Sequence, residues 1–163
     1  MGMDRKSLLL QYGQFAANTE GWYPPYAAAL GGVDVDLANW RPQGAAANTI
    51  WETVAHVTYF KERLLKRIQG QPDQQISSND DTFAVAGSSE GEWQDAIARL
   101  FAAHEALRVA LDRMHDDDLD RRAPEESLIK QFQDLIVHDA YHTGQIILLR
   151  KLKGAWPARR SFL

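Results

Sequence analysis

Two histidines spaced four residues apart in the last long apolar segment constrain this chain more than any other feature. His138 and His142 lie within residues 128–153, LIKQFQDLIVHDAYHTGQIILLRKLK. Side chains suited to a buried face recur there at steps of three and four: Leu128, Phe132, Leu135, His138, His142, Ile146 and Leu149. This period predicts an amphipathic helix. Because residues i and i+4 are neighbours one turn apart, both imidazoles can converge on one metal ion, although such a pair alone is more often structural.

The segment HDAYH also resembles the zinc-protease pattern H-E-x-x-H, with Asp139 in the place of the glutamate. Such enzymes need a third ligand downstream, and after Asp139 the sequence has no Asp, Glu or His except His142. Aspartate is also one methylene shorter than the glutamate that must reach the metal-bound water. The protease interpretation is therefore excluded, and a third ligand has to come from upstream.

Composition narrows the class of protein. A chain of 163 residues suits a single domain, here residues 1–163, and the absence of cysteine excludes disulfides and Cys-based zinc sites. The N-terminus has no signal-peptide pattern and no stretch is long enough to span a bilayer, so we expect a cytoplasmic protein with no membrane partner. A net charge of −4 argues against nucleic-acid binding. The sequence after His142 contains lysines and arginines but no acidic residue. These cations suit either the C-terminus of a helix or a surface that binds an anionic ligand.

The rest of the sequence predicts further helices and no strands. A first helix covers residues 4–19, a short extra helix covers 26–30, and residues 33–47 are predicted as loop. A second helix follows Asn48 as N-cap and ends near Gln69, and Ser89 with Glu92 forms a capping box for a third. Four amphipathic helices indicate an all-α four-helix bundle. The polar segment 70–88 is long for a turn between antiparallel neighbours, so the second and third helices are predicted to run parallel.

Two further histidines are candidates for the site. His56 lies in the inward stripe of the second helix and His104 in that of the third. Burying several imidazoles is costly unless each is paired or coordinated, so an inward His56 makes a metal site and a structural role about equally favoured. For His104 three roles are open: a fourth metal ligand, a hydrogen-bond donor to a ligand, and a hydrogen-bonded core residue. We favour the last two.

Three segments together resemble a known family. HDAYHTGQI, the earlier WETVAHVTYF and the segment WYPPYAAALGGV are similar to the DinB-like (DinB/YfiT) superfamily, and the resemblance extends over nearly the whole chain. It implies a four-helix bundle with up-down-down-up connectivity. It also implies a divalent metal held by three histidines, which correspond to His56, His138 and His142. The resemblance does not supply a substrate.

Three imidazoles leave open coordination positions, as catalytic sites do. We therefore expect a metal-dependent hydrolase or a thiol-dependent S-transferase acting on a small electrophile, since some relatives use low-molecular-weight thiols and this chain has no cysteine of its own. The alternative is a non-catalytic metal-binding stress-response protein. Imidazole ligands suit zinc, nickel, copper and iron alike, with zinc, nickel and iron as our candidates. Residues that could orient ligands or move protons are Asp139, Glu52, Tyr59 and Gln145, although each also suits packing or the surface.

Bundles that resemble this one are often homodimers. Aromatic residues near Trp22, Trp40 and Trp156 suit either a self-association surface or loops that cover the core. The sequence leaves these alternatives open.

Overall fold

The computed structural model describes residues 3–43 and 46–159, and within them every regular element is a helix. The chain is therefore all-α, as the sequence predicted. The elements in chain order are α1 (Arg5–Ala17), α2 (Tyr26–Leu30), α3 (Val35–Asn39), α4 (Ile50–Ile68), the 3-10 helix η1 (Asn79–Phe83), α5 (Glu90–Asp112), the 3-10 helix η2 (Asp116–Asp120) and α6 (Leu128–Leu152). None of these helices is both long and apolar enough to cross a membrane.

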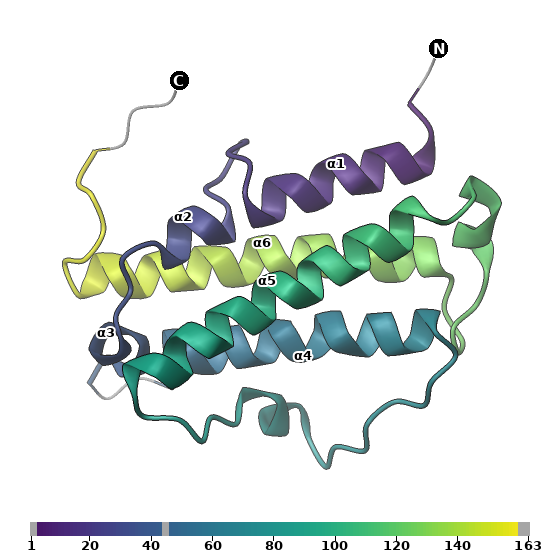
Figure 1. Ribbon diagram of the computed structural model, residues 1–163. Helices are drawn as coiled ribbons and strands as arrows, with labels where there is room; N and C mark the ends of the chain where they lie inside the picture. Colours follow the sequence, from purple (N-terminus) through teal and green to yellow (C-terminus); the bar gives the residue numbers. More distant parts are fainter. Residues whose placement is uncertain (1–2, 44–45, 160–163) are drawn as a thin grey trace.

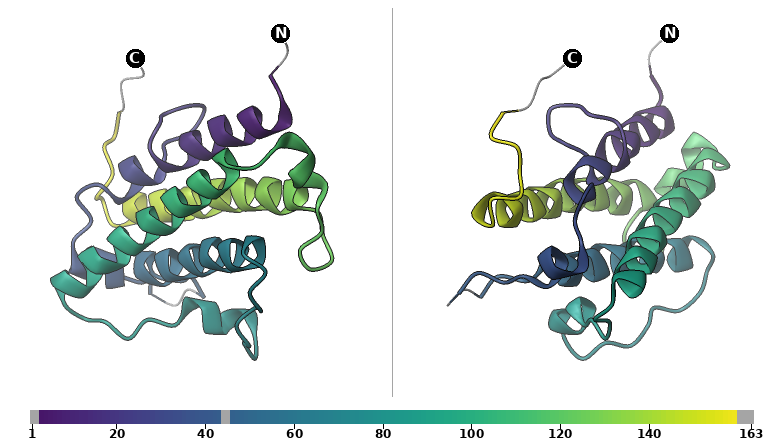
Figure 2. Two further views of the ribbon diagram at one scale, coloured as in Figure 1. Left: turned by 45° about the vertical axis from the view of Figure 1, so that its right-hand side comes forward. Right: turned by 60° about the vertical axis from the view of Figure 1, so that its left-hand side comes forward.

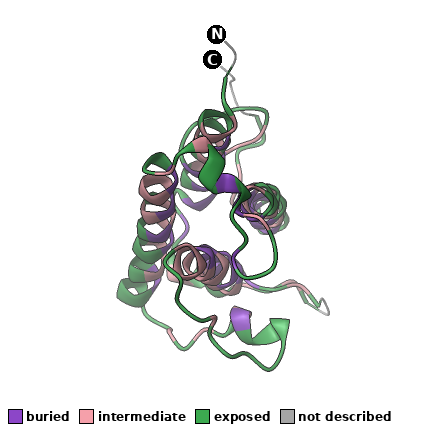
Figure 3. Ribbon diagram, turned by 90° about the vertical axis from the view of Figure 1, so that its right-hand side faces the viewer, coloured by how far each residue is buried: buried purple, intermediate pink, exposed green. Residues whose placement is uncertain are grey.

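The four long helices surround a common core. Helix α4 packs against both α5 and α6, and α1 packs against the same two helices from the other side (Figure 2). In Figure 1, α4 and α5 both begin at the left-hand end, whereas α1 and α6 both begin at the right-hand end. The segment between α4 and α5 returns along the outside of the molecule and carries η1. Buried residues lie on the sides of the helices that face one another (Figure 3).

Local capping explains where the helices begin. The Asp4 side chain accepts from Ser7 N at the start of α1, and Ser89 with Glu92 forms the predicted capping box of α5. For α4 the cap is Thr49, not the predicted Asn48, and Glu52 completes a capping box there. The predicted loop 33–47 was wrong in part, because it contains α3. The side chain of Asp34 caps that helix by accepting from Leu37 N.

The core divides into two apolar clusters with a polar layer between them. One cluster contains the indole rings of Trp51 and Trp93 together with Ile146, and the other contains Leu107, Leu128 and Phe132. On α6 the two clusters are separated by residues 138–143, of which Asp139, His142 and Thr143 are buried. The polar layer therefore places histidines from α6 in the middle of the molecule rather than at its end.

Candidate metal centre

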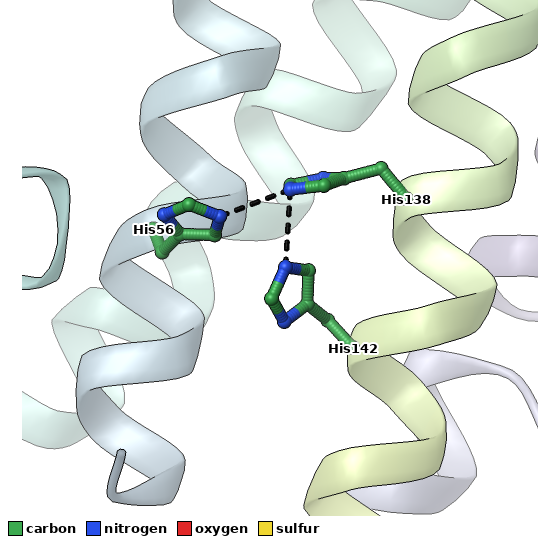
Figure 4. A group of neighbouring side chains, drawn as sticks. All are labelled: His56, His138 and His142. Carbon is green, nitrogen blue, oxygen red and sulfur yellow. Dashed lines mark hydrogen bonds between the residues drawn. The ribbon is translucent and has the colours of Figure 1, made fainter. Parts of the chain in front are cut away.

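Three histidines from two helices converge between α4 and α6. His56 comes from α4, and His138 and His142 lie one turn apart on α6 (Figure 4). The Nε2 atoms of His56 and His142 each lie 3.0 Å from Nε2 of His138. One ligand atom from each residue lies within 4.8 Å of the others, so the three histidines could hold a metal ion. The structure thus brings together the three residues that the sequence singled out.

A second hydrogen bond fixes the tautomer of two of the rings. The Thr82 hydroxyl donates to the carbonyl of Asn79 at 2.6 Å, so it accepts from Nδ1–H of His56, also at 2.6 Å. The Gln145 carbonyl oxygen can only accept, so Nδ1 of His142 donates to it at 2.7 Å. Neutral His56 and His142 therefore both carry their proton on Nδ1. Their Nε2 lone pairs point toward His138.

This arrangement fits a cation better than it fits hydrogen bonds alone. Nε2 of His138 can carry one hydrogen at most, yet two lone pairs face it. Nδ1 of His138, unlike Nδ1 of His56 and His142, has no hydrogen-bond partner among residues 3–43 and 46–159, and a cation at Nε2 would not supply one. A divalent cation among the three Nε2 atoms would accept every lone pair. Outer hydrogen bonds such as those from Thr82 and Gln145 are typical of metal-ligating histidines.

The histidines are neutral near pH 7. Burial, followed by the charges of His142 and His138, lowers the pKa of His56 to about 3. Burial, followed by the charge of Lys61, lowers the pKa of His138 to about 4. Burial, followed by the charge of His138, lowers the pKa of His142 to about 4. Metal binding requires unprotonated imidazole, so these shifts keep the lone pairs available.

All three histidines line an open cleft of about 530 Å³. Its walls are partly aromatic: Phe83 stacks on the His56 ring at 3.9 Å between centroids, Phe60 packs edge-on at 4.9 Å, and Tyr141 lies 4.9 Å from the His142 ring. Its polar lining comes from Asn48, Asn79, Asp80 and Gln145. We call this space the histidine cleft.

Of the four other residues singled out from the sequence, only Gln145 has a hydrogen bond to a histidine of the cluster. Asp139 forms a buried ion pair with Lys61 and accepts from the Tyr26 hydroxyl at 3.4 Å. Glu52 caps α4 and pairs with Arg41. The Tyr59 ring packs on Phe60 at 5.3 Å.

His104 lies apart from the cluster of three. It lines a small cavity between α1, α5 and α6, together with Lys61 and Asp139. Burial, followed by the charge of Lys61, lowers its pKa to about 4. Its position is that of a core residue beside a buried ion pair, not of a fourth ligand.

Sequence reasoning missed the contribution of η1. Thr82 and Phe83 orient and cover the His56 ring, yet they belong to a polar segment with no periodic pattern. A contact between residues 26 positions apart leaves no local signal. The one hint is the short apolar run at residues 83–86, directly after the acidic residues Asp80 and Asp81.

Fold and cluster together describe an all-helical protein with a buried group of three histidines open to a cleft. Comparison with known families places it further: the family model of the DinB superfamily matches residues 25–146, and the chain belongs to that superfamily. The matched stretch includes all three histidines of the cluster. No curated protein and no solved structure matches the chain.

Proposed function

We propose that this protein is a divalent-metal-dependent enzyme that acts on a small electrophilic substrate at the three-histidine centre. The observation that carries the proposal is the convergence of the Nε2 atoms of three histidines that line an open cleft. A structural metal site is normally closed by four protein ligands, whereas three histidines leave a position for water or substrate. Zinc, nickel and iron all suit the imidazole donors.

The residues of the cleft have separate tasks in this proposal. His56, His138 and His142 would hold the metal, and Thr82 and Gln145 keep two of them in the tautomer that presents Nε2. When bound, such a metal would supply Lewis-acid chemistry: polarisation of a substrate and activation of water or an external thiol near neutral pH. Phe60 and Phe83 exclude water from one side. Asp80 provides the carboxylate that lines the cleft and can accept a proton.

Two reaction classes fit this arrangement: hydrolysis, and S-transfer from a low-molecular-weight thiol. A thiol has to be a cosubstrate, since the sequence contains no cysteine. The alternative function is a non-catalytic metal-binding protein of a stress response. A fourth protein ligand would favour that alternative, and the residue considered for it, His104, lies in a different cavity.

Metal content of the untagged protein is the first test. We expect about one zinc, nickel or iron ion per chain in the wild type. His142→Ala should weaken affinity by more than about 100-fold, since even loss of an outer partner costs 10–100-fold. His104→Ala is the matched control, because it removes a half-buried histidine outside the cluster, and it should retain the metal. If the wild type stays metal-free after these metals are added, the three histidines are core residues and not metal ligands.

Activity then separates the alternatives. The metal-loaded protein is assayed for ester hydrolysis and for thiol addition to an aromatic electrophile, with His142→Ala and His104→Ala in parallel. Activity that His142→Ala loses and His104→Ala keeps supports an enzyme. A protein that binds its metal tightly but accelerates neither reaction favours the non-catalytic alternative.

We also propose a single-domain four-helix bundle with up-down-down-up connectivity, a cytoplasmic location and a homodimer. The helix directions in Figure 1 support the connectivity. For the homodimer, the supporting feature is a row of exposed apolar residues along α6: Val137, Tyr141, Leu148 and Leu152. Trp40 and Trp156 pack against the core, whereas Trp22 is fully exposed. Sedimentation velocity on wild type and Leu148→Glu tests self-association through this face.

A further inference from the structure

A second cleft lies beside the histidine cleft and is lined by residues of α4 and α6. It has a volume of about 230 Å³, and its walls include Arg63 and Arg67 of α4 and Gln131 of α6. Phe60 and His138 line both clefts. Their rings pack edge-on at 5.1 Å between centroids, so the two rings lie at the boundary between the clefts. We call the second space the arginine cleft.

Arg63 lies over the Phe60 ring at this boundary and has unused hydrogen-bond donors. Its Cζ atom is 5.8 Å from the centroid of the Phe60 ring, and that ring in turn contacts His56 and His138. Nε of Arg63 donates to Asp73 at 2.8 Å. Its two terminal nitrogens have no hydrogen-bond partner among residues 3–43 and 46–159, and the side chain is 31% exposed. The fork of a guanidinium matches a carboxylate in geometry.

The hydrogen-bond donors of Arg67 are largely used within the protein, so this side chain mainly holds its neighbours in place. It donates through Nε to Asp73 at 2.8 Å and through Nη1 to Gln131 at 3.0 Å, and it also pairs with Asp73 through Nη2. Because Asp73 is already shared between two guanidinium groups, it neutralises only part of their charge. Arg63 is therefore the group that can engage a ligand.

Charge around the arginine cleft selects among anions. Glu126 and Asp134 line its opposite wall, and both pair with Lys130. The cations facing this region are matched in number by acids: Arg63, Arg67 and Lys130 against Asp73, Glu126 and Asp134. A dianion such as a phosphate monoester would add two negative charges to this balanced region and would be repelled by the carboxylates of Glu126 and Asp134. A single carboxylate can instead pair with Arg63 without a large excess of charge.

We propose that the arginine cleft binds the carboxylate of a small organic acid whose other end reaches the three-histidine centre. Arg63 receives the carboxylate, and Phe60 supports the carbon chain between the two ends. The inference rests on the proposed metal centre, and it narrows the substrate or cosubstrate to an acid of limited length. The distance is short, because Arg63 lies seven residues from His56 on one helix, about 10.5 Å along its axis, and its side chain folds back over Phe60.

The test measures a length-dependent preference for a carboxylate on protein loaded with cobalt(II). The probes are ω-mercapto acids with two to six carbons, compared with ω-mercapto alcohols of the same lengths. Thiolate binding to cobalt gives a charge-transfer band that reports occupancy at the centre. At the best chain length, we expect the acid to bind about tenfold more tightly than the alcohol of the same length, as for one charged hydrogen-bonded contact. Shorter and longer acids should lose this preference.

Substitutions assign the preference to Arg63. In Arg63→Gln the acid and the alcohol should bind equally, whereas Arg63→Lys should retain part of the preference. Arg99→Gln is the matched control: Arg99 pairs with Glu62 of α4 at 2.6 Å and lines neither cleft. It should keep the full preference. Equal cobalt content and circular dichroism in all variants show that the centre and the fold are intact.

Failure of the inference differs from failure of the metal centre. If the wild type takes up no cobalt, the proposed metal centre and the carboxylate site are both overturned. If cobalt binds and the alcohols give the band as readily as the acids at every length, the carboxylate site is overturned while the centre stands. A preference that survives in Arg63→Gln, or that Arg99→Gln lowers equally, also overturns it, because the selectivity then comes from the overall field of the protein.

Discussion

Thr82 carries one hydroxyl that makes two hydrogen bonds, and both serve His56. The hydroxyl donates to the carbonyl of Asn79 and accepts from Nδ1–H of His56. Valine has nearly the same shape but cannot accept, so Thr82→Val should leave the His56 ring free to rotate or to change tautomer. We expect metal affinity to fall about 10–100-fold, measured by competition with a chromophoric chelator.

Thr58→Val is the matched control for this substitution. Thr58 is also buried, lies on α4, and donates to the carbonyl of Val54 away from the histidines. It should change affinity little. Equal affinity in wild type and Thr82→Val would mean that Phe83 stacking alone holds the ring.

Local spacing made part of the site predictable at the residue scale. His138 and His142 are fixed relative to each other by helix geometry, and a period of three to four placed His56 on an inward face. The pairing of His56 with α6 was supplied by the family resemblance, since spacing within one helix says nothing of its neighbour. Thr82 and Arg63 could not be assigned from sequence. Their roles depend on how the 70–88 segment and the groove between α4 and α6 are arranged in space.

At the scale of elements, the segment between α4 and α5 is held in place by a contact at Gly87. A Cβ atom added to Gly87 would come within 2.6 Å of Trp51 Cζ2 and 2.7 Å of Cη2. Trp51 is buried and packs on Trp93 at 5.5 Å, so its ring has no room to retreat. The segment that carries η1 therefore passes close to the core just before α5 begins.

Gly87→Ala should consequently destabilise the protein by about 1–3 kcal/mol, the usual cost of overpacking. Urea unfolding followed by tryptophan fluorescence measures the change. Gly91→Ala is the control, because Gly91 lies in the first turn of α5 with nothing within 4 Å of an added Cβ. It should be neutral or stabilising, since alanine favours helix over glycine. An unchanged unfolding free energy in Gly87→Ala would show that the segment moves freely away from Trp51.

Helix boundaries could be predicted where the sequence contains a recognisable capping motif. The S-x-x-E pattern at Ser89 marked the start of α5 correctly, because both of its hydrogen bonds form. Helix α3 was missed since five residues are too few to show a period, although Asp34 provides the cap. The 3-10 helix η2 in the connection from α5 to α6 has no periodic pattern by which it could be predicted. Its Asp116 and Asp120 pair with Arg5 of α1.

For the whole molecule, four histidines of depressed pKa make stability depend on pH. The pKa of His56 is lowered to about 3 and those of His104, His138 and His142 to about 4, in each case chiefly by burial. An unfolded chain binds protons at these groups near pH 6.5, whereas the folded chain does not until pH 4 or below. Their contribution to stability is therefore complete above about pH 6.5 and is lost as the pH falls toward 4.

The metal-free protein should accordingly lose stability on mild acidification. At pH 5 we expect unfolding to be accompanied by the uptake of roughly three to four protons at these histidines. The slope of the unfolding free energy against pH between 7.5 and 4.5 measures this uptake. His104→Ala should lower the uptake by about one proton while leaving metal binding intact, which separates the core histidine from the cluster. Zinc in excess should raise stability at pH 7.5 and lose that effect toward pH 5, because protons compete for the same nitrogens. A stability independent of pH across this range would mean that the imidazoles are solvated, and the buried polar layer would then not exist in solution.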